Sequence, residues 1–389
     1  MMTGNSKGDN DYAGFEQGPI RPPSEAASLL LRVTRNCPWN RCSFCPVYKG
    51  AQFSLRPVDH VLRDIDAVHR HVVALRERME VSGTLDYRQL SLLADGLGDG
   101  DQLALYAARA WLADGMESIF LQDANSLVIR PDDLVTILRY IRERFPEVER
   151  ITSYARSQTI DRISAEQMGR LAEAGLNRIH IGMESGSDAV LQKVQKGCDR
   201  QVHIRAGQKV KAAGMELSEY VMPGLGGRTL SREHALQTAD ALNRIAPDFI
   251  RLRTLAIPGH TELFGEWREG RFDKLGDREV AEEILLFLES LDGINSRVQS
   301  DHILNLFQEL EGDLPQDQPS MTGVIHRFLA LADEEQLVYQ VGRRMGLFAR
   351  LDDLQHGPRR RRAEQAIAQY GVTQENVDQL IDDLMKRFI

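Results

Sequence analysis

The sequence predicts an α/β fold built around parallel strands, and two observations carry this prediction. First, one unit repeats along the middle of the chain: a segment with helical periodicity, often a glycine, and then a short apolar segment typical of a buried strand. Second, these helices and strands alternate, which is the order that produces a parallel sheet. The periodicity alone allows the sheet either to curl into a barrel or to stay open and doubly wound.

Six short strands are expected, the first of them directly before a cluster of cysteines. Their ranges are 27–33, 118–122, 150–154, 177–184, 216–222 and 248–255. Helices are expected from 57 to beyond 75 and at 104–113, 131–145, 165–174, 203–213 and 232–245. Gly115, Gly175 and Gly214 each follow a helix, at the position where a left-handed residue commonly ends it.

The last third of the chain has a different pattern, because the strand signal fades beyond residue 263. Helices are expected there at 277–291, 301–310, 323–332, 334–345 and 376–388. The first residues of the chain are polar and rich in glycine, which is typical of a loosely held segment. We therefore expect a flexible N-terminal arm at 1–22, an α/β core at 23–268 and an all-helical C-terminal region at 269–389.

Composition and charge exclude several classes of protein. The 389 residues, 42% of them hydrophobic, are enough for a sizeable globular core. The formal net charge of −9 counts against a nucleic-acid partner, since proteins that bind phosphate backbones usually carry a basic face. The sequence has neither a run of about 18 apolar residues nor the pattern of a secretion signal. A cytoplasmic protein with no membrane partner is expected.

Three of the four cysteines, Cys37, Cys42 and Cys45, fall within nine residues. A closed structural zinc site or a ferredoxin-type cluster takes four protein ligands, and this loop contains no histidine. Three thiolates suit a [4Fe–4S] cluster whose fourth iron is left open for a small ligand, and an open metal position is typical of catalysis. A zinc knuckle, or three incidental cysteines, is the alternative.

The spacing Cys37-x4-Cys42-x2-Cys45, with Phe44 before the last cysteine, resembles the cluster loop of the radical S-adenosylmethionine (SAM) superfamily. The usual loop is C-x3-C-x2-C, so this chain has one additional residue. The resemblance implies that the three cysteines hold a [4Fe–4S] cluster, that Phe44 lies near SAM, and that SAM chelates the fourth iron. One electron then cleaves SAM to methionine and a 5′-deoxyadenosyl radical, which abstracts a hydrogen atom. A partial (β/α)6 barrel of TIM type over 23–268 is also implied, with a reducing partner such as flavodoxin or ferredoxin.

Segments at the ends of the expected strands are assigned to SAM by the same resemblance. The segment 121–127 takes the place of a Gly-Gly-Glu turn but lacks its glycines, so Asp123 or Asn125 would accept a hydrogen bond from the SAM ammonium. The alternative is an ordinary loop. The segment 182–187, Gly-Met-Glu-Ser-Gly-Ser, resembles the motif of elongator-type and coproporphyrinogen dehydrogenase-type members.

That motif implies that Glu184 and Ser185 contact the SAM ribose or carboxylate and that Ser187 caps the next helix. The glycine-rich segment 222–229 follows the fifth expected strand, and Gly224 lets its backbone approach the cofactor. By itself, this segment has neither the dinucleotide-binding nor the phosphate-loop spacing.

Strand alternation assigns polar side chains to the interior of the sheet. Apolar residues occupy one parity of the strands 177–184 and 248–255, which leaves the polar residues facing inward. Buried charges are costly unless they are paired or solvated, so such an interior predicts a space that holds ligand. The residues assigned to a small-molecule substrate are Tyr154, Arg156, His180, Arg251 and Arg253. The two arginines are expected to bind an anionic group of that substrate; ion pairs with Glu184 or Glu219 are the alternative.

Three other features are interpreted as structural. Cys198 is expected to be incidental, with a radical site, hydrogen donor or extra metal ligand as the alternative. Asp301 and His302 are expected to open a helix rather than form a catalytic pair. The arginine run 359–362 is expected to be solvated rather than a nucleic-acid patch.

The expected function is therefore that of a radical SAM enzyme acting on a small molecule. Two alternatives remain open: a radical SAM enzyme that modifies tRNA, which the acidic charge counts against, and a non-catalytic metal-binding or electron-carrier protein. The sequence makes no prediction about the oligomeric state.

Overall fold

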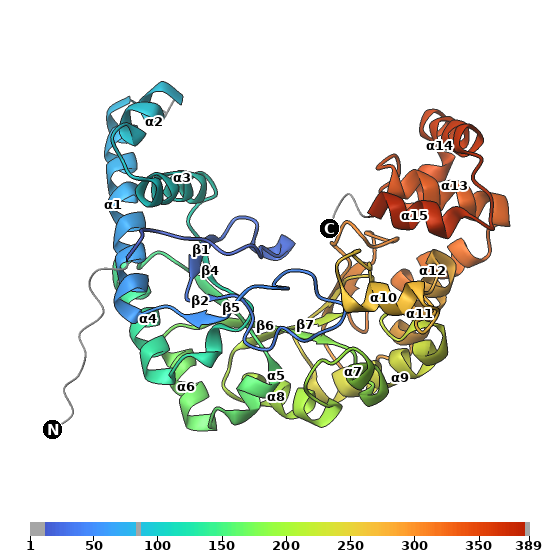
Figure 1. Cartoon of the computed structure of the whole chain (residues 1–389), viewed down its shortest axis with the longest axis horizontal. Coiled ribbons are helices and arrows are strands. Elements are labelled where there is room, and N and C mark those ends of the chain that lie inside the picture. The colour runs from blue at the N-terminus through green and yellow to red at the C-terminus, as the bar shows by residue number, and fades with distance from the viewer. Residues whose placement is uncertain (1–11, 83–86, 386–389) are drawn as a thin grey trace. The chain divides into compact units, whose positions relative to one another are not determined.

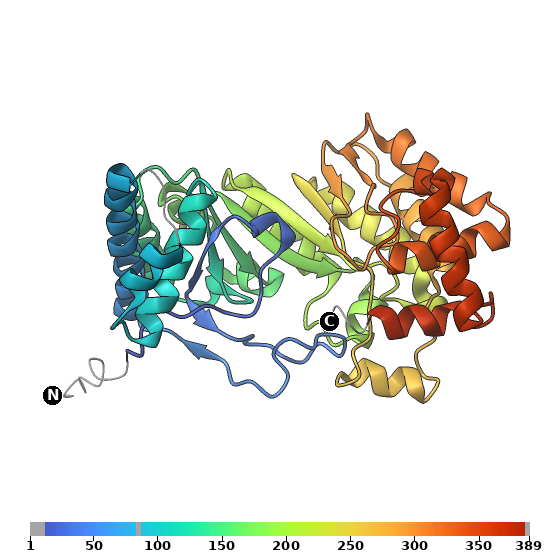
Figure 2. The same ribbon diagram turned by 90° about the horizontal axis from the view of Figure 1, so that it is seen from above.

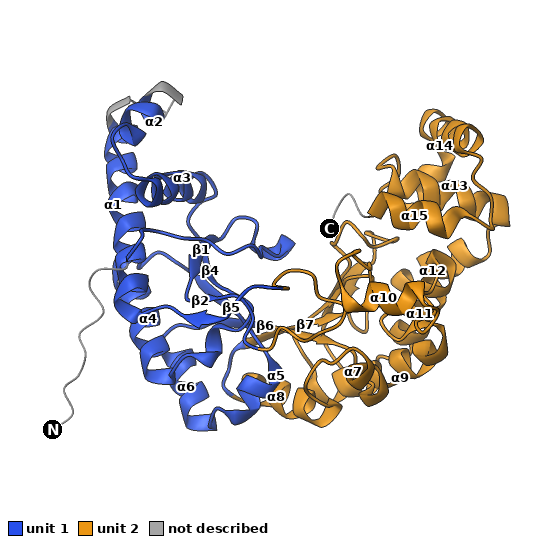
Figure 3. Ribbon diagram, viewed as in Figure 1, with its two compact units in different colours: residues 1–38, 50–180, 213–215 blue, residues 39–49, 181–212, 216–389 orange. Residues whose placement is uncertain are grey.

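A computed structural model describes residues 12–82 and 87–385. The chain forms two compact units, shown in blue and orange in Figure 3. Unit 1 comprises residues 1–38, 50–180 and 213–215, and unit 2 comprises residues 39–49, 181–212 and 216–389. Strand β6 (Arg178–Glu184) begins in unit 1 and ends in unit 2.

Unit 1 is built from parallel strands and covering helices. Its strands are β1 (Leu29–Arg32), β2 (Thr34–Arg35), β3 (Ser54–Leu55), β4 (Ser118–Gln122) and β5 (Arg150–Ala155). Its helices are α1 (Val58–Ser82), α2 (Tyr87–Ala94), α3 (Asp99–Ala113), α4 (Pro131–Arg144), α5 (Ser157–Arg162) and α6 (Ala165–Glu173), with 3-10 turns η1 (Pro23–Glu25) and η2 (Ser126–Val128). β1 pairs in parallel with β4 and β4 with β5, whereas β2 and β3 are antiparallel. α1 packs against α3 and α4 (Figure 1).

Helix α4 illustrates why these segments are helical. It begins at Pro131, whose fixed φ suits the first helical position, and Asp132 follows in the first turn. Arg142 and Arg144 lie in the last turn, so the charges at both ends complement the helix dipole. The buried residues Leu134, Val135, Ile137, Leu138 and Ile141 lie at helical spacing and form one apolar face.

Unit 2 combines parallel strands with a larger set of helices. Its strands are β7 (Glu216–Val221), β8 (Phe249–Leu252), β9 (Arg297–Gln299) and β10 (Glu311–Asp313). Its helices are α7 (Asp188–Lys193), α8 (Arg200–Ala212), α9 (Gly227–Ile245), α10 (Glu262–Arg268), α11 (Asp277–Glu289), α12 (Gln318–Leu329), α13 (Asp333–Arg344), α14 (Gly357–Tyr370) and α15 (Val377–Met385), with the 3-10 turn η3 (Leu351–Gln355). β7 with β8 and β8 with β9 are parallel, and β9 with β10 is antiparallel.

The helices at the end of unit 2 share one apolar cluster. α13, α14 and α15, drawn in orange and red in Figure 2, contribute most of its residues. Its buried residues are Leu304, Leu337, Val341, Ala366, Val372, Val377, Ile381 and Met385. Burying a side chain of this size contributes roughly 1.5–3 kcal/mol, so the cluster is enough to hold three short helices together.

The six predicted strands are confirmed as β1 and β4 to β8. Positive φ angles at Gly115, Gly175 and Gly214 confirm the predicted left-handed helix ends. The last predicted strand was too long, because β8 ends at Leu252 and the Thr254 backbone N–H donates to the Asn305 side chain at 2.8 Å.

The predicted helix at 301–310 is wrong, and so is the expectation that the C-terminal region contains helices only. No helix covers these residues, and β9 and β10 lie on either side of them. Asn305 accounts for the irregular backbone: its Nδ2 donates to the Leu252 carbonyl at 2.7 Å and to Ser300 Oγ at 2.9 Å. The hydrogen bonds of this buried amide hold the backbone in a loop, and they outweigh the preference of the local sequence for a helix. The region is otherwise helical, as predicted, and the arginine run 359–362 lies at the start of α14.

The expected flexible arm is described only from residue 12, since residues 1–11 lie outside the described residues. Residues 12–22 are packed against the rest of unit 1. Gln122 is buried, its Oε1 accepts from the Gly18 backbone N–H at 2.7 Å, and its Nε2 donates to the Ile20 carbonyl at 2.5 Å. The Tyr12 hydroxyl donates to Asp64 at 2.8 Å, and Phe15 is buried. The polar composition predicted a loose arm because composition carries no information about hydrogen bonds to distant residues.

Candidate active site

Asp123, expected to bind the SAM ammonium, is enclosed by groups of unit 1. Its Oδ2 accepts hydrogen bonds from the Arg32 guanidinium at 2.7 and 2.9 Å and from the Asn36 backbone N–H at 2.9 Å. A Cβ atom on Gly18 would lie 2.3 Å from its Oδ1. These contacts support the alternative of a structural loop, and the cofactor role stays a prediction.

Asn125 in the same loop is also used within unit 1. Its Nδ2 donates to Thr159 Oγ1 at 2.8 Å, and its Oδ1 accepts from the Arg156 backbone N–H at 3.0 Å. The side chain is buried. Asn125 therefore fixes the segment that follows β5, which bears the half-buried Arg156 expected at the substrate.

Tyr154 and His180 lie together, as strand alternation predicted. Their ring centroids are 5.3 Å apart, and Phe120 packs against both. His180 is fully buried, and its Nε2 is 3.1 Å from Glu25 Oε1. Burial acts to raise the pKa of Glu25, but the hydrogen bonds from His180 and Ser28 outweigh it, so that pKa is lowered. The ionised Glu25 therefore ties His180 into the unit, and substrate binding by His180 stays a prediction.

The cysteine segment passes from one unit to the other. Cys37 belongs to unit 1, and Cys42 and Cys45 belong to unit 2. None of the three forms a disulfide, and all are half-buried. Within residues 12–82 and 87–385, no group of three or more His, Cys, Asp or Glu side chains is assembled that could hold a metal ion. The use of the three thiols as one ligand set stays a prediction.

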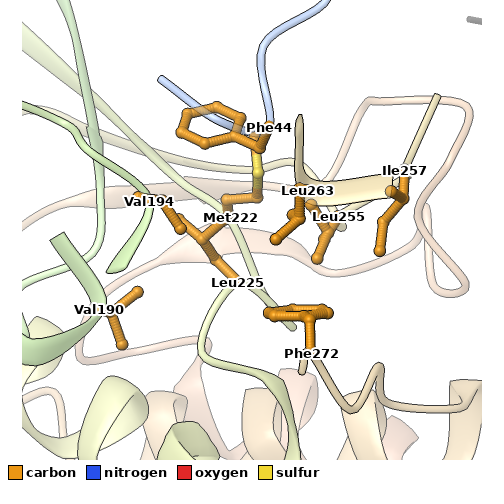
Figure 4. Close-up of a cluster of buried hydrophobic side chains, with 9 residues drawn as sticks. All are labelled: Phe44, Val190, Val194, Met222, Leu225, Leu255, Ile257, Leu263 and Phe272. Carbon is orange, nitrogen blue, oxygen red and sulfur yellow. The ribbon is translucent and has the colours of Figure 1, made fainter. Parts of the chain in front are cut away.

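Phe44 anchors this segment in unit 2. It is buried in an apolar cluster, which Figure 4 shows with Phe44 at one end and Phe272 at the other. Cys42 and Cys45 pack against the same cluster, and the Cys45 backbone N–H donates to the Cys42 carbonyl at 3.2 Å. Both sulfurs are therefore carried on a backbone held by buried apolar packing.

Trp39 attaches the same segment to the loop after α7. Its indole Nε1 donates to the Gln195 carbonyl at 2.8 Å, and Arg41 lies over its ring at 5.2 Å. A Cβ atom on Gly197 would lie 2.3 Å from the ring, so only glycine admits this contact. A cavity of about 590 Å³ adjoins Trp39 and contains Cys198, whose sulfur is 3.2 Å from His203 Nε2. Cys198 is thus paired with a histidine, which the sequence analysis did not foresee.

Glu184 ends β6 and forms an ion pair that the sequence analysis missed. Its Oε1 is 3.1 Å from Lys196 Nζ, and both side chains are mostly buried. Lys196 Nζ also lies 5.8 Å from the ring centre of Phe44. The contact brings the cysteine segment and the end of β6 together, although Glu184 and Lys196 are separated by a whole helix and no spacing rule pairs them.

Ser185, expected to touch SAM, is fully buried behind Glu184. Its Oγ is 2.8 Å from His234 Nδ1 on α9 and accepts from the Ser187 backbone N–H at 3.0 Å. These contacts support a structural role. The predicted cap is confirmed, since Ser187 Oγ accepts from the Val190 backbone N–H at the start of α7.

Gly224 lies in the buried loop after β7. Its φ of +87° is a conformation that suits glycine, and its N–H donates to Glu283 Oε1 at 2.7 Å. The loop is therefore held by α11, and the approach of its backbone to a cofactor stays a prediction.

The two arginines of the β8 segment differ. Arg251 is buried and pairs with Asp301 at 2.9 Å, so the predicted ion-pair alternative applies with a different acid. Arg253 is half-buried, and no ion pair or side-chain hydrogen bond involves it in the described part of the chain. Burial lowers the pKa of His302 to about 4, helped by the positive charge of Arg253. His302 is therefore neutral at pH 7.

Glu219 on β7 is a buried acid that the sequence analysis mentioned only as an ion-pair candidate. It is fully buried, and neither carboxyl oxygen has a hydrogen-bond partner among the described residues. Burial raises its pKa well above the usual range; Lys196 opposes and Glu184 adds to this shift. Burial therefore favours the protonated form of Glu219.

Comparison with known proteins decides the family. A model of the radical SAM superfamily matches residues 101–239. Residues 101–239 of this chain therefore belong to the radical SAM superfamily. This stretch runs from α3 through the end of β6 into α9, and so includes the motif around Glu184.

Curated relatives are distant. The tRNA uridine(34) acetyltransferase of Methanocaldococcus infernus is 24% identical over 32% of this chain and 23% of its own length. The CDK5RAP1-like protein of Oryza sativa is 24% identical over 73% of this chain and 46% of its length, and the heme chaperone HemW of Bacillus subtilis is 23% identical over 46% and 48%. The chain spans about half or less of the length of these relatives.

Two solved structures are also similar in part. Coproporphyrinogen III oxidase (HemN) from Escherichia coli covers 72% of this chain and 54% of its own, at 14% identity and a TM-score of 0.43. The Methanocaldococcus infernus Elp3 covers 58% of both chains, at 15% identity and a TM-score of 0.42.

The match to the radical SAM superfamily implies a [4Fe–4S] cluster and SAM. The donor set fits such a cluster in kind, because iron–sulfur clusters are held by cysteine thiolates and none of the three cysteines of the loop is bound in a disulfide. The fold is α/β, with parallel strands in each unit and a largely helical C-terminal region. Such enzymes take a substrate and need a reductant. Among the described helices, none has the length and apolar character of a membrane span.

Proposed function

We propose that this radical SAM enzyme abstracts a hydrogen atom from an anionic small-molecule substrate. When bound, the cluster and SAM supply the radical that takes the atom. The observation that carries the proposal is Arg253, a half-buried cation with no acid paired to it among the described residues. A guanidinium in such surroundings is costly unless an anion or water compensates it, so its retention favours a bound carboxylate or phosphate.

His302 supports the same assignment. It is neutral at pH 7, and its Nδ1 accepts from the Leu304 backbone N–H at 3.2 Å. The proton of the neutral ring is therefore on Nε2, which is left as a donor. Arg253 with this donor provides two groups suited to one anion. Arg251 takes no part in the proposal, because Asp301 already neutralises it.

For the cofactor, we propose Glu184, Phe44 and the Gly224 loop as the SAM-binding groups of unit 2. The Glu184 carboxylate is held toward Lys196, and Lys196 lies over Phe44, so the three side chains form one cluster. A carboxylate of this kind can accept hydrogen bonds from ribose hydroxyls. The electron is proposed to come from a small carrier such as flavodoxin or ferredoxin.

The test uses enzyme purified without oxygen and reconstituted with iron and sulfide. Deuterated carboxylates and phosphates are offered with SAM and dithionite, and deuterium is sought in 5′-deoxyadenosine. Transfer from an anionic compound is expected, with a KM that rises roughly tenfold in Arg253→Gln and little in Arg251→Gln. Transfer from a neutral compound with an unchanged KM in Arg253→Gln would refute the anionic class. Cys42→Ala is the control and should release no 5′-deoxyadenosine.

The names of several curated relatives favour a second candidate, the modification of tRNA. Phosphates of RNA are also anions that Arg253 could meet. The net charge of −9 argues against it, since phosphate contacts need a cluster of cations. A tRNA gel shift whose affinity falls steeply between 50 and 200 mM salt would support this candidate.

A further inference from the structure

A buried histidine connects the two loops that follow β6 and β7 in unit 2. His234 lies on α9 and is 1% exposed. Its Nδ1 is 2.8 Å from Ser185 Oγ, and its Nε2 is 3.1 Å from the Met222 carbonyl oxygen. Ser185 follows Glu184 directly, and Met222 begins the loop that contains Gly224. One side chain therefore bridges the ends of two strands.

The direction of these hydrogen bonds follows from the groups involved. A carbonyl oxygen only accepts, so Nε2 carries the proton and donates it to Met222. Nδ1 lies at hydrogen-bonding distance from the Ser185 hydroxyl on the other side of the ring. The Ser185 oxygen in turn accepts from the Ser187 backbone N–H. The ring is thus held at both nitrogens, by Met222 on one side and by Ser185 on the other, with Thr238 Oγ1 at 3.4 Å from the same Nδ1.

Helix α11 adds a second support to the same loops. Glu283 Oε1 accepts from the Gly224 backbone N–H at 2.7 Å, and Oε2 accepts from the Ser231 hydroxyl at 2.5 Å. Glu283 is buried and lies 3.7 Å from His234 Nε2. Thr238 lies on α9, as His234 does, and its Oγ1 accepts from the Gly186 backbone N–H at 2.8 Å. The loop backbones thus depend on side chains from two helices.

The conformation of Glu184 shows what this support has to achieve. Its φ is +65°, in the left-handed region that residues with a side chain rarely adopt. Such a conformation persists only where the surroundings determine it, and it is common at functional sites. The Glu184 carbonyl accepts from the Met222 backbone N–H at 3.0 Å, so the strained residue is tied directly to the second loop. Its side chain reaches Lys196 from this backbone geometry.

We infer that His234 is a positioning residue for SAM binding: it holds Glu184 and the Gly224 loop in the arrangement that receives the cofactor. The inference rests on the proposed use of these two segments for SAM. His234 is buried, so it acts through the residues that it contacts, above all Ser185 and Met222. Residues that orient the groups touching a metal or cofactor typically change affinity ten- to a hundredfold when replaced.

The test measures SAM binding without turnover. Reconstituted enzyme without reductant is titrated with SAM by equilibrium dialysis, and hydrogen exchange is followed in peptides covering 183–188 and 221–227. His234→Leu is expected to bind SAM roughly ten- to a hundredfold more weakly and to exchange faster in both peptides. His234→Gln, which keeps a donor for the Met222 carbonyl, should lose less affinity and loosen mainly 183–188.

Asn243→Ala is the matched control. Asn243 lies on the same helix, donates to the Ser290 carbonyl at 3.0 Å and accepts from the Asp292 backbone N–H at 3.0 Å, so the variant also loses two hydrogen bonds. It should lower the melting temperature without changing SAM affinity. If His234→Leu binds SAM as the native enzyme does, or weakens binding no more than Asn243→Ala, the inference is overturned; if His234→Leu does not fold, His234→Gln decides by the same criterion.

The outcome is separable from that of the proposed function. SAM binding needs no substrate, so finding no anionic substrate leaves the role of His234 untouched. A native enzyme that binds SAM but abstracts hydrogen from a neutral compound overturns only the proposed substrate class.

Discussion

The strand ends of unit 1 and of unit 2 use their polar groups differently. In the loop after β4, Asp123 and Asn125 are engaged by hydrogen bonds from unit 1 itself. At the end of β8, Arg253 has no acid beside it among the described residues, and the neighbouring His302 is uncharged. A bonded polar group fixes the fold, whereas one with hydrogen-bonding capacity left can hold a ligand. Position at a strand end is therefore not sufficient to identify a binding residue.

The largest effect is expected in unit 1. Asp123→Asn removes the negative charge that Arg32 meets in a buried ion pair, so the free energy of unfolding should fall by roughly 3–5 kcal/mol. Anaerobic urea denaturation measures this loss. SAM affinity of the folded variant should stay near the native value. A stable Asp123→Asn protein that no longer binds SAM would reverse our interpretation of this loop.

Glu219 offers the opposite case in unit 2, a buried acid whose polar atoms are unsatisfied. Because its pKa in the folded protein is well above the ordinary value, the unfolded chain loses this proton first as the pH rises. Stability should therefore fall as the pH increases from about 4.5 through the raised pKa. Glu219→Leu should remove this fall and stabilise the protein by roughly 1–3 kcal/mol at pH 8. Thermal unfolding at pH 5 and pH 8 checks it, and an unchanged pH dependence contradicts it.

Arg251 and Arg253 allow a paired cation and one unpaired among the described residues to be compared within the same strand segment. Arg253→Gln should weaken substrate binding roughly tenfold and change the melting temperature little, since no ion pair within the described residues is lost. Arg251→Gln should do the reverse, because it breaks the pair with Asp301. Substrate titration and calorimetry on both variants are the measurements. Equal effects on affinity would show that pairing does not separate the two residues.

The smallest effect concerns the packed segment at 12–22. Tyr12→Phe removes one hydrogen bond to Asp64, which also pairs with Arg56, so a loss of about 1 kcal/mol is expected. Limited proteolysis should then cut this segment sooner than in the native protein. Identical cleavage rates would show that other contacts hold the segment.

Much of the fold was predictable because short local sequence patterns determine the strands and the helix ends. Alternating apolar residues located all six strands, and glycines located three helix ends. The failures lie where distant contacts decide. The helix expected at 301–310 is absent because Asn305 bonds to β8, more than 50 residues earlier. The segment 12–22 is packed because Gln122 satisfies its backbone, about 100 residues away.

The candidate site divides in the same way. The cysteine spacing and the motif around Glu184 could be recognised in the sequence, since both are short continuous segments. Strand parity assigned Tyr154 and His180 to the same interior, but it could not show that His180 forms a hydrogen bond with Glu25. His234 and Glu283 were missed because nothing near them in the sequence marks them; only the folded chain brings them to the loops after β6 and β7.

The contact between Gly197 and Trp39 has one more consequence. The indole can lie on this turn only because the turn has no side chain there, so the smallest residue sets how closely the thiol-bearing segment approaches the end of α7. A single methyl group at 197 would displace the indole and so disturb the start of the segment that bears Cys42 and Cys45. We therefore expect that substitutions of Gly197 are poorly tolerated, although glycine has no functional side chain.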